Sequence, residues 1–302
     1  MRAYRVAYDG RPFHGFQRQP DVRTVEGALF DALRDLDVLD ADAPKPAGYA
    51  AAGRTDAGVS ARAQTVAFEG PDWLTPAALN SELPESVRAW AGADVPGDFH
   101  ATHDARYREY VYFLYAPRGG DGGIDMSRDG GGDTVPTGGT DCDDTPGDAF
   151  DDGRARDALG RLAGEHDFHN LTPDDEGTVR DLSASAERDG SFLVVTLRAG
   201  GFARQLVRRV VGLVAAVSRG ESPPAKVDRV LASDPLDGPD GVPPAPAYPL
   251  VLWDVSYGAG VDFRVDETAV ESAREVWADR RAERLTAARV AGLLRDGIGN
   301  RR

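Results

Sequence analysis

The strongest constraint on the fold is that a strand followed by a helix occurs in both halves of the chain. In the first half, the alternating segment "YRVAYDG" (4–10) precedes "TVEGALFDALRDL" (24–36), in which apolar residues recur at helical spacing. In the second half, segment 105–117 alternates again and begins a second series, which ends with the strand-like "LVLWDVSYG" (250–258). This succession predicts an α+β protein of two halves, each a sheet that carries helices.

Local signals predict where several helices begin. Thr24 is the expected N-cap of the first helix, and Thr75, which stands before a proline, is the expected start of a short second one. In the second half, the apolar run "FARQLVRRVVGLVAAVSRG" predicts a helix over 202–220. Such a helix would place Arg204 and Arg208 on one face, because residues four apart are neighbours on a helix.

Composition changes along the chain predict the domain boundaries. We expect an N-terminal α/β domain over 1–105 and a C-terminal α/β domain over 106–258. Within the second, residues 118–153 are rich in glycine and aspartate and poor in large apolar residues, which predicts a mobile acidic loop. Residues 259–302 predict a charged helical extension, either one or two helices docked on the body or a solvated appendage. Its apolar stripe consists of Val270, Ala273, Val276 and Trp277.

The charge of the chain at first argues against a polyanionic partner. The 302 residues include 35 Lys and Arg against 50 Asp and Glu, a net charge of -15. However, the only lysines are Lys45 and Lys226, and the acidic excess is spread along the chain. An acid-rich, lysine-poor surface is typical of a halophilic protein, since the Debye length falls to about 3 Å at 1 M salt. We interpret the net charge as adaptation to salt, which leaves nucleic acid open as a partner.

The sequence predicts a cytoplasmic protein without a membrane segment. The single cysteine, Cys142, excludes an intrachain disulfide and fits a reducing compartment. The N-terminal "MRAYRVAYDG" lacks the apolar run of a signal peptide, and no stretch reaches the roughly 18 apolar residues of a membrane helix.

No metal or cofactor site is predicted. Two histidine pairs, "HATH" and "HDFH", have the i,i+3 spacing of helical metal ligands, but neither comes with a cysteine pair or an HExxH motif. We expect capping and loop roles for these four histidines, which are His100, His103, His166 and His169. The glycines of "GRTDAG" are not followed by the Lys-Ser/Thr of a P-loop, and no G-x-S-x-G elbow surrounds a serine.

One short turn, "AAGRTDAGVSA" (51–61), carries the most suggestive side chains. It contains Arg54 and Asp56 between glycines. An aspartate in such a turn usually accepts hydrogen bonds from its own backbone, so by itself the turn favours a capping role.

Four motifs change this weighting because they occur in order over about the first 257 residues: "YDGRPFHGFQRQPDVRTVEGALFDAL", "GRTDAGVSARAQ", "FHATHDARYREYVYFLY" and "GGFARQLVRRVVG". In these motifs the chain resembles the tRNA pseudouridine synthase A family. The resemblance implies two ferredoxin-like α/β domains that form a continuous sheet with a central active-site cleft, in a homodimer. It also implies isomerisation of uridine to pseudouridine in the anticodon stem-loop of tRNA, at positions about 38 to 40, by base flipping and without cofactor or metal.

The resemblance assigns roles to four residues. Asp56 is the catalytic carboxylate, as nucleophile or as base. It must be ionised, and burial favours the neutral acid, so a nearby cation is needed; Arg208 matches the family's ion-pair partner. Arg54 matches the arginine that assists base flipping, and Tyr107 matches the tyrosine that packs on the uracil. Ser60 departs from bacterial members, which commonly have histidine there.

Two other classes of function remain open from the residues. A catalytically inactive tRNA-binding module of the same fold would keep Arg54 and Tyr107 but would not need Asp56. A carboxylate-dependent glycosidase would need a second acid facing Asp56, for which Glu109 or Asp104 could be proposed.

Overall fold

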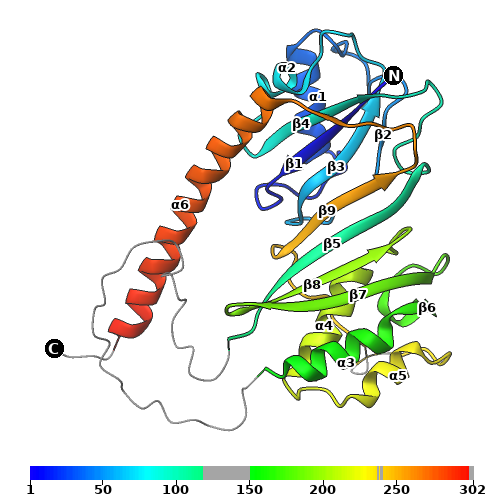
Figure 1. Ribbon diagram of the computed structural model, residues 1–302, viewed down its shortest axis with the longest axis vertical. Coiled ribbons are helices and arrows are strands. Elements are labelled where there is room, and N and C mark those ends of the chain that lie inside the picture. The colour runs from blue at the N-terminus through cyan, green and yellow to red at the C-terminus, as the bar shows by residue number, and fades with distance from the viewer. Residues whose placement is uncertain (118–149, 237, 239–240, 299–302) are drawn as a thin grey trace. The chain divides into compact units, whose positions relative to one another are not determined.

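The computed structural model describes residues 1–117, 150–236, 238 and 241–298, as a mixed α/β chain in two compact units (Figure 1). The α+β class predicted from the strand and helix pattern is therefore confirmed. Most of the predicted acidic loop, with Cys142, lies outside the described residues. Unit 1 comprises Met1–Val111, Arg198–Phe202 and Pro246–Arg302, and unit 2 comprises Tyr112–Leu197 and Ala203–Ala245.

Unit 1 contains a mixed sheet with the strand order β10-β4-β1-β3-β9 and with β2 paired to β3. Strand β1 is antiparallel to both β3 and β4, whereas β9 lies parallel to β3, with Ser60 opposite Val251. Strand β9, which the sequence analysis placed in the second half, thus completes the sheet of unit 1. The bounds are β1 Arg2–Tyr8, β2 Ala50–Ala51, β3 Ser60–Phe68, β4 Val87–Asp94, β9 Leu250–Tyr257 and β10 Arg264–Val265.

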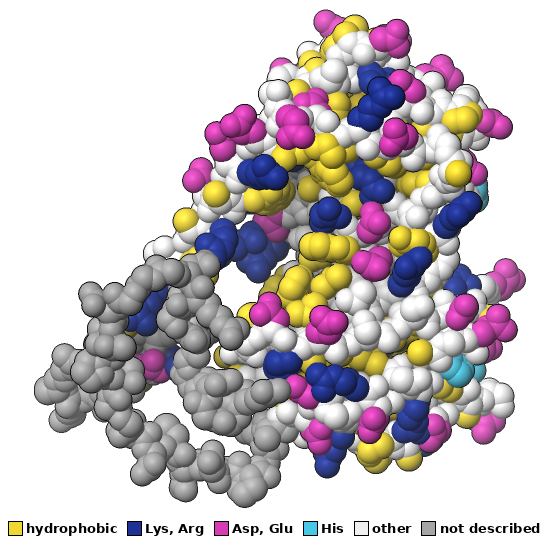
Figure 2. Space-filling model, in the orientation of Figure 1, with side chains coloured by type: hydrophobic (Ala, Val, Ile, Leu, Met, Phe, Trp, Pro, Cys, Tyr) yellow, Lys and Arg dark blue, Asp and Glu magenta, His cyan; other side chains and the backbone are white. Residues whose placement is uncertain are grey.

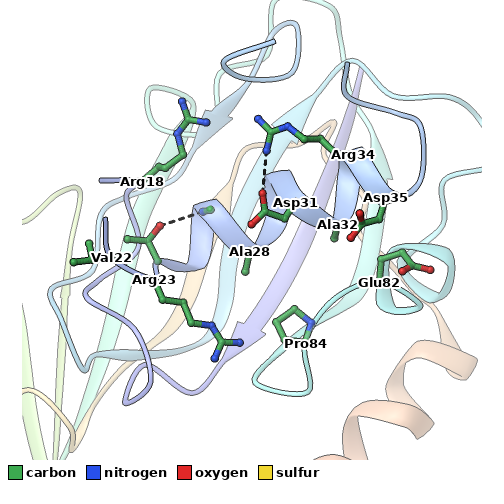
Figure 3. Close-up of a pocket in the computed structure, with 12 residues that line it drawn as sticks. Arg18, Val22, Arg23, Ala28, Asp31, Ala32, Arg34, Asp35, Glu82 and Pro84 are labelled. Carbon is green, nitrogen blue, oxygen red and sulfur yellow. Dashed lines mark hydrogen bonds and ion pairs between the residues drawn. The ribbon is translucent and has the colours of Figure 1, made fainter. Parts of the chain in front are cut away.

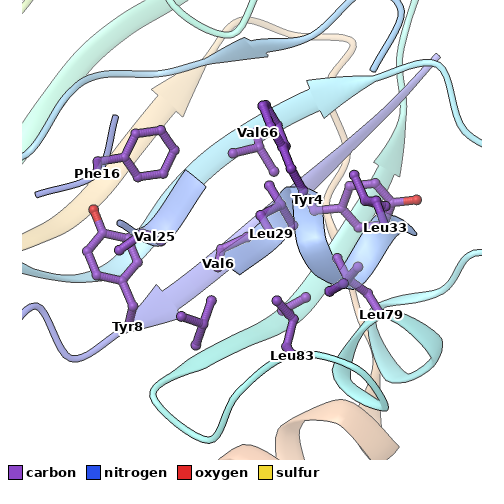
Figure 4. Packing of buried hydrophobic residues seen from close by; sticks show 14 of the residues in the cluster. Tyr4, Val6, Tyr8, Phe16, Val25, Leu29, Leu33, Val66, Leu79 and Leu83 are labelled. Atoms are coloured by element: carbon purple, nitrogen blue, oxygen red, sulfur yellow. The ribbon is translucent and has the colours of Figure 1, made fainter. Parts of the chain in front are cut away.

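Helix α1 (Val25–Asp35) covers the core of unit 1 with one apolar face. Thr24 caps it as predicted, because its hydroxyl accepts a hydrogen bond from the Gly27 amide at 3.2 Å. Leu29 and Leu33 are buried beside the β1 residue Tyr4, as Figure 4 shows. Burial of each such side chain contributes about 1.5–3 kcal/mol. The short helix α2 (Pro76–Asn80) begins at its predicted cap, Thr75.

The described part of unit 2 has strands in the order β8-β7-β6, together with three α-helices. Strand β5 (Ala105–Tyr115) passes from unit 1 into unit 2. The remaining bounds are β6 Gly164–Asp167, β7 Val179–Asp189, β8 Phe192–Ala199, α3 Asp152–Leu162, α4 Leu206–Ser218, α5 Ala225–Leu231 and a 3-10 turn His169–Leu171.

Helix α4 begins later than the sequence predicts. Gln205 has φ 60°, in the left-handed region, so the helix starts at Leu206 and not at 202. Arg204 lies before the helix, where its amide donates to Asp174 at 2.7 Å. The predicted shared helix face of Arg204 and Arg208 is therefore wrong.

The C-terminal extension forms one long helix, α6 (Glu267–Gly297). Near its start, Ala269 and Ala273 are 1% and 8% exposed, so this part docks on unit 1. Further along, Val290 and Leu294 are 50% and 63% exposed. The first turns of α6 are thus docked on the body and the later turns are solvated, so each of the two alternatives for the extension holds for one part of the helix. None of the helices in the described segments is long and apolar enough to span a bilayer.

Candidate active site

Asp56 lies half-buried in the loop that connects β2 to β3. Its carbonyl accepts a hydrogen bond from the Val59 amide at 3.1 Å, which closes a tight turn. Thr55 and Val59 on either side are 6% and 3% exposed, whereas the Arg54 side chain is exposed. Within this loop the side chains of Thr55 and Val59 are therefore buried, whereas Arg54 is exposed and Asp56 is half-buried.

The Asp56 loop, residues 53–59, is held by the first family motif. The Tyr8 hydroxyl lies 2.7 Å from the Thr55 hydroxyl, and the Phe16 amide donates to the Thr55 carbonyl at 3.0 Å. A Cβ on Gly10 would lie 2.1 Å from the Val59 carbonyl oxygen, so only glycine permits this approach of the two backbones. These contacts place the glycine of "YDG" directly against the turn of "GRTDAG".

Arg108 supports the start of the same loop, a role that was not predicted from the sequence. Its Nη2 donates to the carbonyls of Ala52 and Thr102, both at 2.7 Å, and its Nη1 donates to that of Gly200 at 2.5 Å. Burial lowers the pKa of Arg108 from its ordinary value. A guanidinium with several fixed donors can bind three carbonyls together, which makes Arg108 a brace for residue 52.

Tyr110 is a partly buried tyrosine whose pKa is raised by its burial and in part by the charge of Asp56. Burial raises the pKa of Tyr110 to about 12; Arg108 lowers it and Asp56 raises it further. The ring lies edge-on to Phe202, with centroids 5.2 Å apart. Since side chains alternate along a strand, Arg108 and Tyr110 share one face of β5. That alternation, visible in "ARYREY", was the signal that could have identified Tyr110.

Tyr107 lies in a different setting. The Arg198 guanidinium carbon lies 3.3 Å from the Tyr107 ring centroid, so Arg198 covers one face of the ring. Tyr107 is three residues from Tyr110, so the strand alternation turns it to the opposite face of β5. The structure therefore places Arg54 and Asp56 in one loop, and Tyr107 and Tyr110 on opposite faces of β5.

Arg208 belongs to unit 2 and is described there. Its Nε donates to the Ala245 carbonyl at 2.8 Å, and its own carbonyl accepts from the Ala245 amide at 2.9 Å. A Cβ on Gly212 would lie 2.5 Å from the Pro243 carbonyl oxygen, so α4 and this segment pack backbone to backbone. Arg208 is thus held firmly on α4.

The histidines take part in local hydrogen bonds. The His100 Nδ1 accepts from the Thr102 amide at 3.2 Å, and the His166 ring contacts the Ala163 carbonyl at 3.0 Å. Within the segments that the structure describes, no three His, Cys, Asp or Glu side chains are grouped to hold a metal ion.

A pocket of about 350 Å³ opens beside α1 (Figure 3). Three arginines and three acids line it, and Arg34 donates to Asp31 at 3.0 Å, so charges of both signs offset one another. Figure 2 shows the same mixture of acidic and basic side chains over the face in view. Neither Asp56 nor Arg54 nor Tyr107 lines this pocket.

Comparison with known proteins defines the class. A family model described as tRNA pseudouridine synthase matches residues 158–258. A tRNA pseudouridine synthase A of Haloarcula marismortui is 57% identical over 298 residues, 99% of this chain and 100% of the relative. That of Natronomonas pharaonis is 58% identical over 97% of this chain and 98% of its own length, and that of Methanosarcina acetivorans is 34% identical over 90% of each.

Pseudouridine synthases are isomerases, and these matches make the chain an enzyme of that class. The chain belongs to the tRNA pseudouridine synthase A family. The resemblance read from its four motifs is confirmed, and the relatives of Haloarcula and Natronomonas are haloarchaeal.

Proposed function

We propose that this protein isomerises uridine to pseudouridine in the anticodon stem-loop of tRNA, at positions about 38 to 40, with Asp56 as the reacting carboxylate. The observation that supports this most is the presentation of Asp56. It is half-buried on a loop whose flanking residues are buried and held by hydrogen bonds from Tyr8 and Phe16. A fixed carboxylate of this kind suits reaction at a sugar carbon, where position matters more than mobility.

The reaction can be balanced with this single carboxylate. The bond from uracil N1 to C1′ breaks, a bond from C5 to C1′ forms, C5 loses its proton and N1 gains one. Asp56 either attacks C1′ and is displaced by C5, or removes the C2′ proton to give a glycal and returns it later. A tRNA deuterated at C2′ of the target uridine separates these routes, since only proton removal predicts a primary isotope effect.

We propose Arg208 as the ion-pair partner that keeps Asp56 ionised. Its attachment to Ala245 through Nε and through the backbone supports a fixed orientation for this guanidinium. An opposite charge offsets the cost of moving a carboxylate out of water.

The flipped base needs support from a flat side chain. Arg54 is exposed beside Asp56, and its planar guanidinium suits stacking and phosphate contact during flipping. The family motif suggests Tyr107 as the residue that packs on uracil, and we propose it for this role; Arg198 fixes its ring from one face. Tyr110 is the less suited tyrosine, because its ring packs edge-on against Phe202 and against the core of unit 1.

The family resemblance supports further proposals on assembly and setting. These are two ferredoxin-like domains forming a continuous sheet with a central cleft, a homodimer, a cytoplasmic location and adaptation to high salt. Phosphate contacts weaken steeply with salt, so in this setting shape and stacking should supply more of the tRNA affinity.

The direct test is incubation with unmodified tRNA in concentrated potassium chloride with a chelator, followed by chemical mapping of pseudouridine. Conversion confined to the anticodon stem-loop supports the proposal, and conversion elsewhere contradicts the site. Loss of conversion in chelator alone would point to a metal. Tight binding of tRNA without any conversion would instead favour the inactive binding module.

A further inference from the structure

Asp9, in the first family motif, is a buried carboxylate with two cations from the far end of the chain. Its side chain is 5% exposed. Its Oδ2 accepts hydrogen bonds from Arg280 Nη1 at 3.2 Å and from Arg284 Nη2. Its Oδ1 accepts from the Arg11 amide at 3.3 Å. Removing the cations from a buried carboxylate costs several kcal/mol, so Asp9 depends on helix α6.

Helix α6 is itself anchored before it reaches Asp9. The Asp266 amide donates to the Trp90 carbonyl of β4 at 3.1 Å, and the Asp266 carboxylate accepts from the Ala77 amide of α2 at 3.0 Å. The same carboxylate caps the helix through the Ala269 amide. Arg280 and Arg284 follow about four and five turns later, at 3.6 residues per turn. The helix therefore connects the β4 and α2 side of unit 1 to the motif that contains Asp9.

The segment after Asp9 makes three hydrogen bonds with the Asp56 loop and with Ser60, the β3 residue that follows it. The Gly10 amide donates to the Ser60 hydroxyl at 3.0 Å. The Phe16 amide donates to the Thr55 carbonyl at 3.0 Å, and the Gly58 amide donates to the Phe13 carbonyl at 3.4 Å. Because Gly10 also lies against the Val59 carbonyl, with no room for a Cβ, residues 10–16 cannot shift without moving the Asp56 loop.

From this chain of contacts we propose that α6 is a strut, and that Arg280 and Arg284 are positioning residues which hold the Asp56 loop in place through Asp9. The effect on turnover rests on the role proposed for Asp56 above; the effect on loop order does not. The helix lies outside the four family motifs, so this assigns a task to the C-terminal extension. A guanidinium pair is suited to it because each arginine can keep several donors on one carboxylate.

The test uses the full-length protein with Arg280→Gln and Arg284→Gln together. Arg274→Gln with Arg289→Gln is the matched control, since it removes two cations from the same helix. We expect the first pair to lower kcat by about ten- to a hundredfold with KM for tRNA changed less than about threefold. Hydrogen exchange of residues 53–60 should become faster in that variant and stay unchanged in the control.

Adding Asp9→Asn to the first pair should leave kcat and the exchange as they are in that pair, because the ion pairs through which the helix holds the loop are absent from both variants. If the double variant does not fold, the single variants, each of which leaves one arginine on Asp9, should show the same changes in smaller measure. Unchanged exchange at 53–60, a loss that falls on KM alone, or a triple variant restored to the wild-type rate would each overturn the strut, the last because the loss would then come from an unpaired buried charge. If exchange responds as expected while Asp56→Asn retains activity, the strut stands and the role of Asp56 falls.

Discussion

Two aspartates of unit 1 stand in similar sequence surroundings and in different environments. Asp9 in "YDG" and Asp56 in "TDAG" both precede glycine closely, in loops that touch one another. Asp9 is 5% exposed and has two arginine partners from α6, whereas Asp56 is half-buried beside the exposed Arg54. Deep burial thus distinguishes the structural carboxylate of Asp9 from the half-buried carboxylate that we propose reacts with the substrate.

The largest expected effect tests the Asp56 side of this comparison. Asp56→Asn should lower the single-turnover rate by on the order of a thousandfold or more, because the neutral amide can neither attack C1′ nor accept a proton. Arg208→Ala alone should cost about a hundredfold, yet little more when added to Asp56→Asn. Full additivity of the two losses would contradict a functional pair.

The next effect concerns which tyrosine supports the flipped base beside Asp56. Tyr107→Ala should lower kcat by about ten- to a hundredfold, since stacking on a base contributes about 1–3 kcal/mol. Tyr110→Phe, which keeps the packed ring, should cost less than about threefold. Steady-state kinetics on one tRNA substrate decides between them, and the reverse order would assign the role to Tyr110.

A smaller effect separates the arginine beside Asp56 from those of Asp9. Arg54→Ala should raise KM for tRNA by about tenfold and leave kcat within about threefold, because the residue engages RNA and supports no buried charge. Arg280→Gln with Arg284→Gln should show the opposite division between kcat and KM. Similar profiles for both would remove the distinction.

The smallest effect is on stability at alkaline pH. The pKa of Tyr110 is raised from 10.0 to about 12, so the unfolded chain loses this proton first as pH rises. The free energy of unfolding should therefore fall between pH 10 and pH 12, with up to about 2 kcal/mol of the fall due to Tyr110. Chemical denaturation of Tyr110→Phe should show a correspondingly smaller fall in the free energy of unfolding over this pH range. An identical fall in wild type and variant would contradict a raised pKa for Tyr110.

The local elements could be predicted from the sequence because their signals are local. Thr24 and Thr75 cap the helices they precede, and the apolar residues of α1 face the core. Helix α4 was predicted to begin too early, because an apolar run does not reveal the left-handed backbone at Gln205. Periodicity also gave no indication that β9 pairs with β3, since pairing between distant strands depends on the whole fold.

The candidate site was predictable only where the family motifs marked it. Asp56 stood out in its turn, but the contacts that hold its loop come from Tyr8, Phe16 and Arg108, which are distant in the sequence. The partners of Asp9 lie 271 and 275 residues away in the extension that matched no motif. Such long-range ion pairs leave no periodic pattern in the sequence, so they can be recognised only in the three-dimensional structure.

An assay of pseudouridine formation on one tRNA in concentrated salt compares Asp56→Asn with Asp9→Asn side by side. We expect Asp56→Asn to bind tRNA normally and to form no pseudouridine within many wild-type turnover times. We expect Asp9→Asn to retain at least about a tenth of the wild-type rate, because its arginine partners can be solvated. Conversion by Asp56→Asn at a rate close to wild type would contradict the role proposed for Asp56.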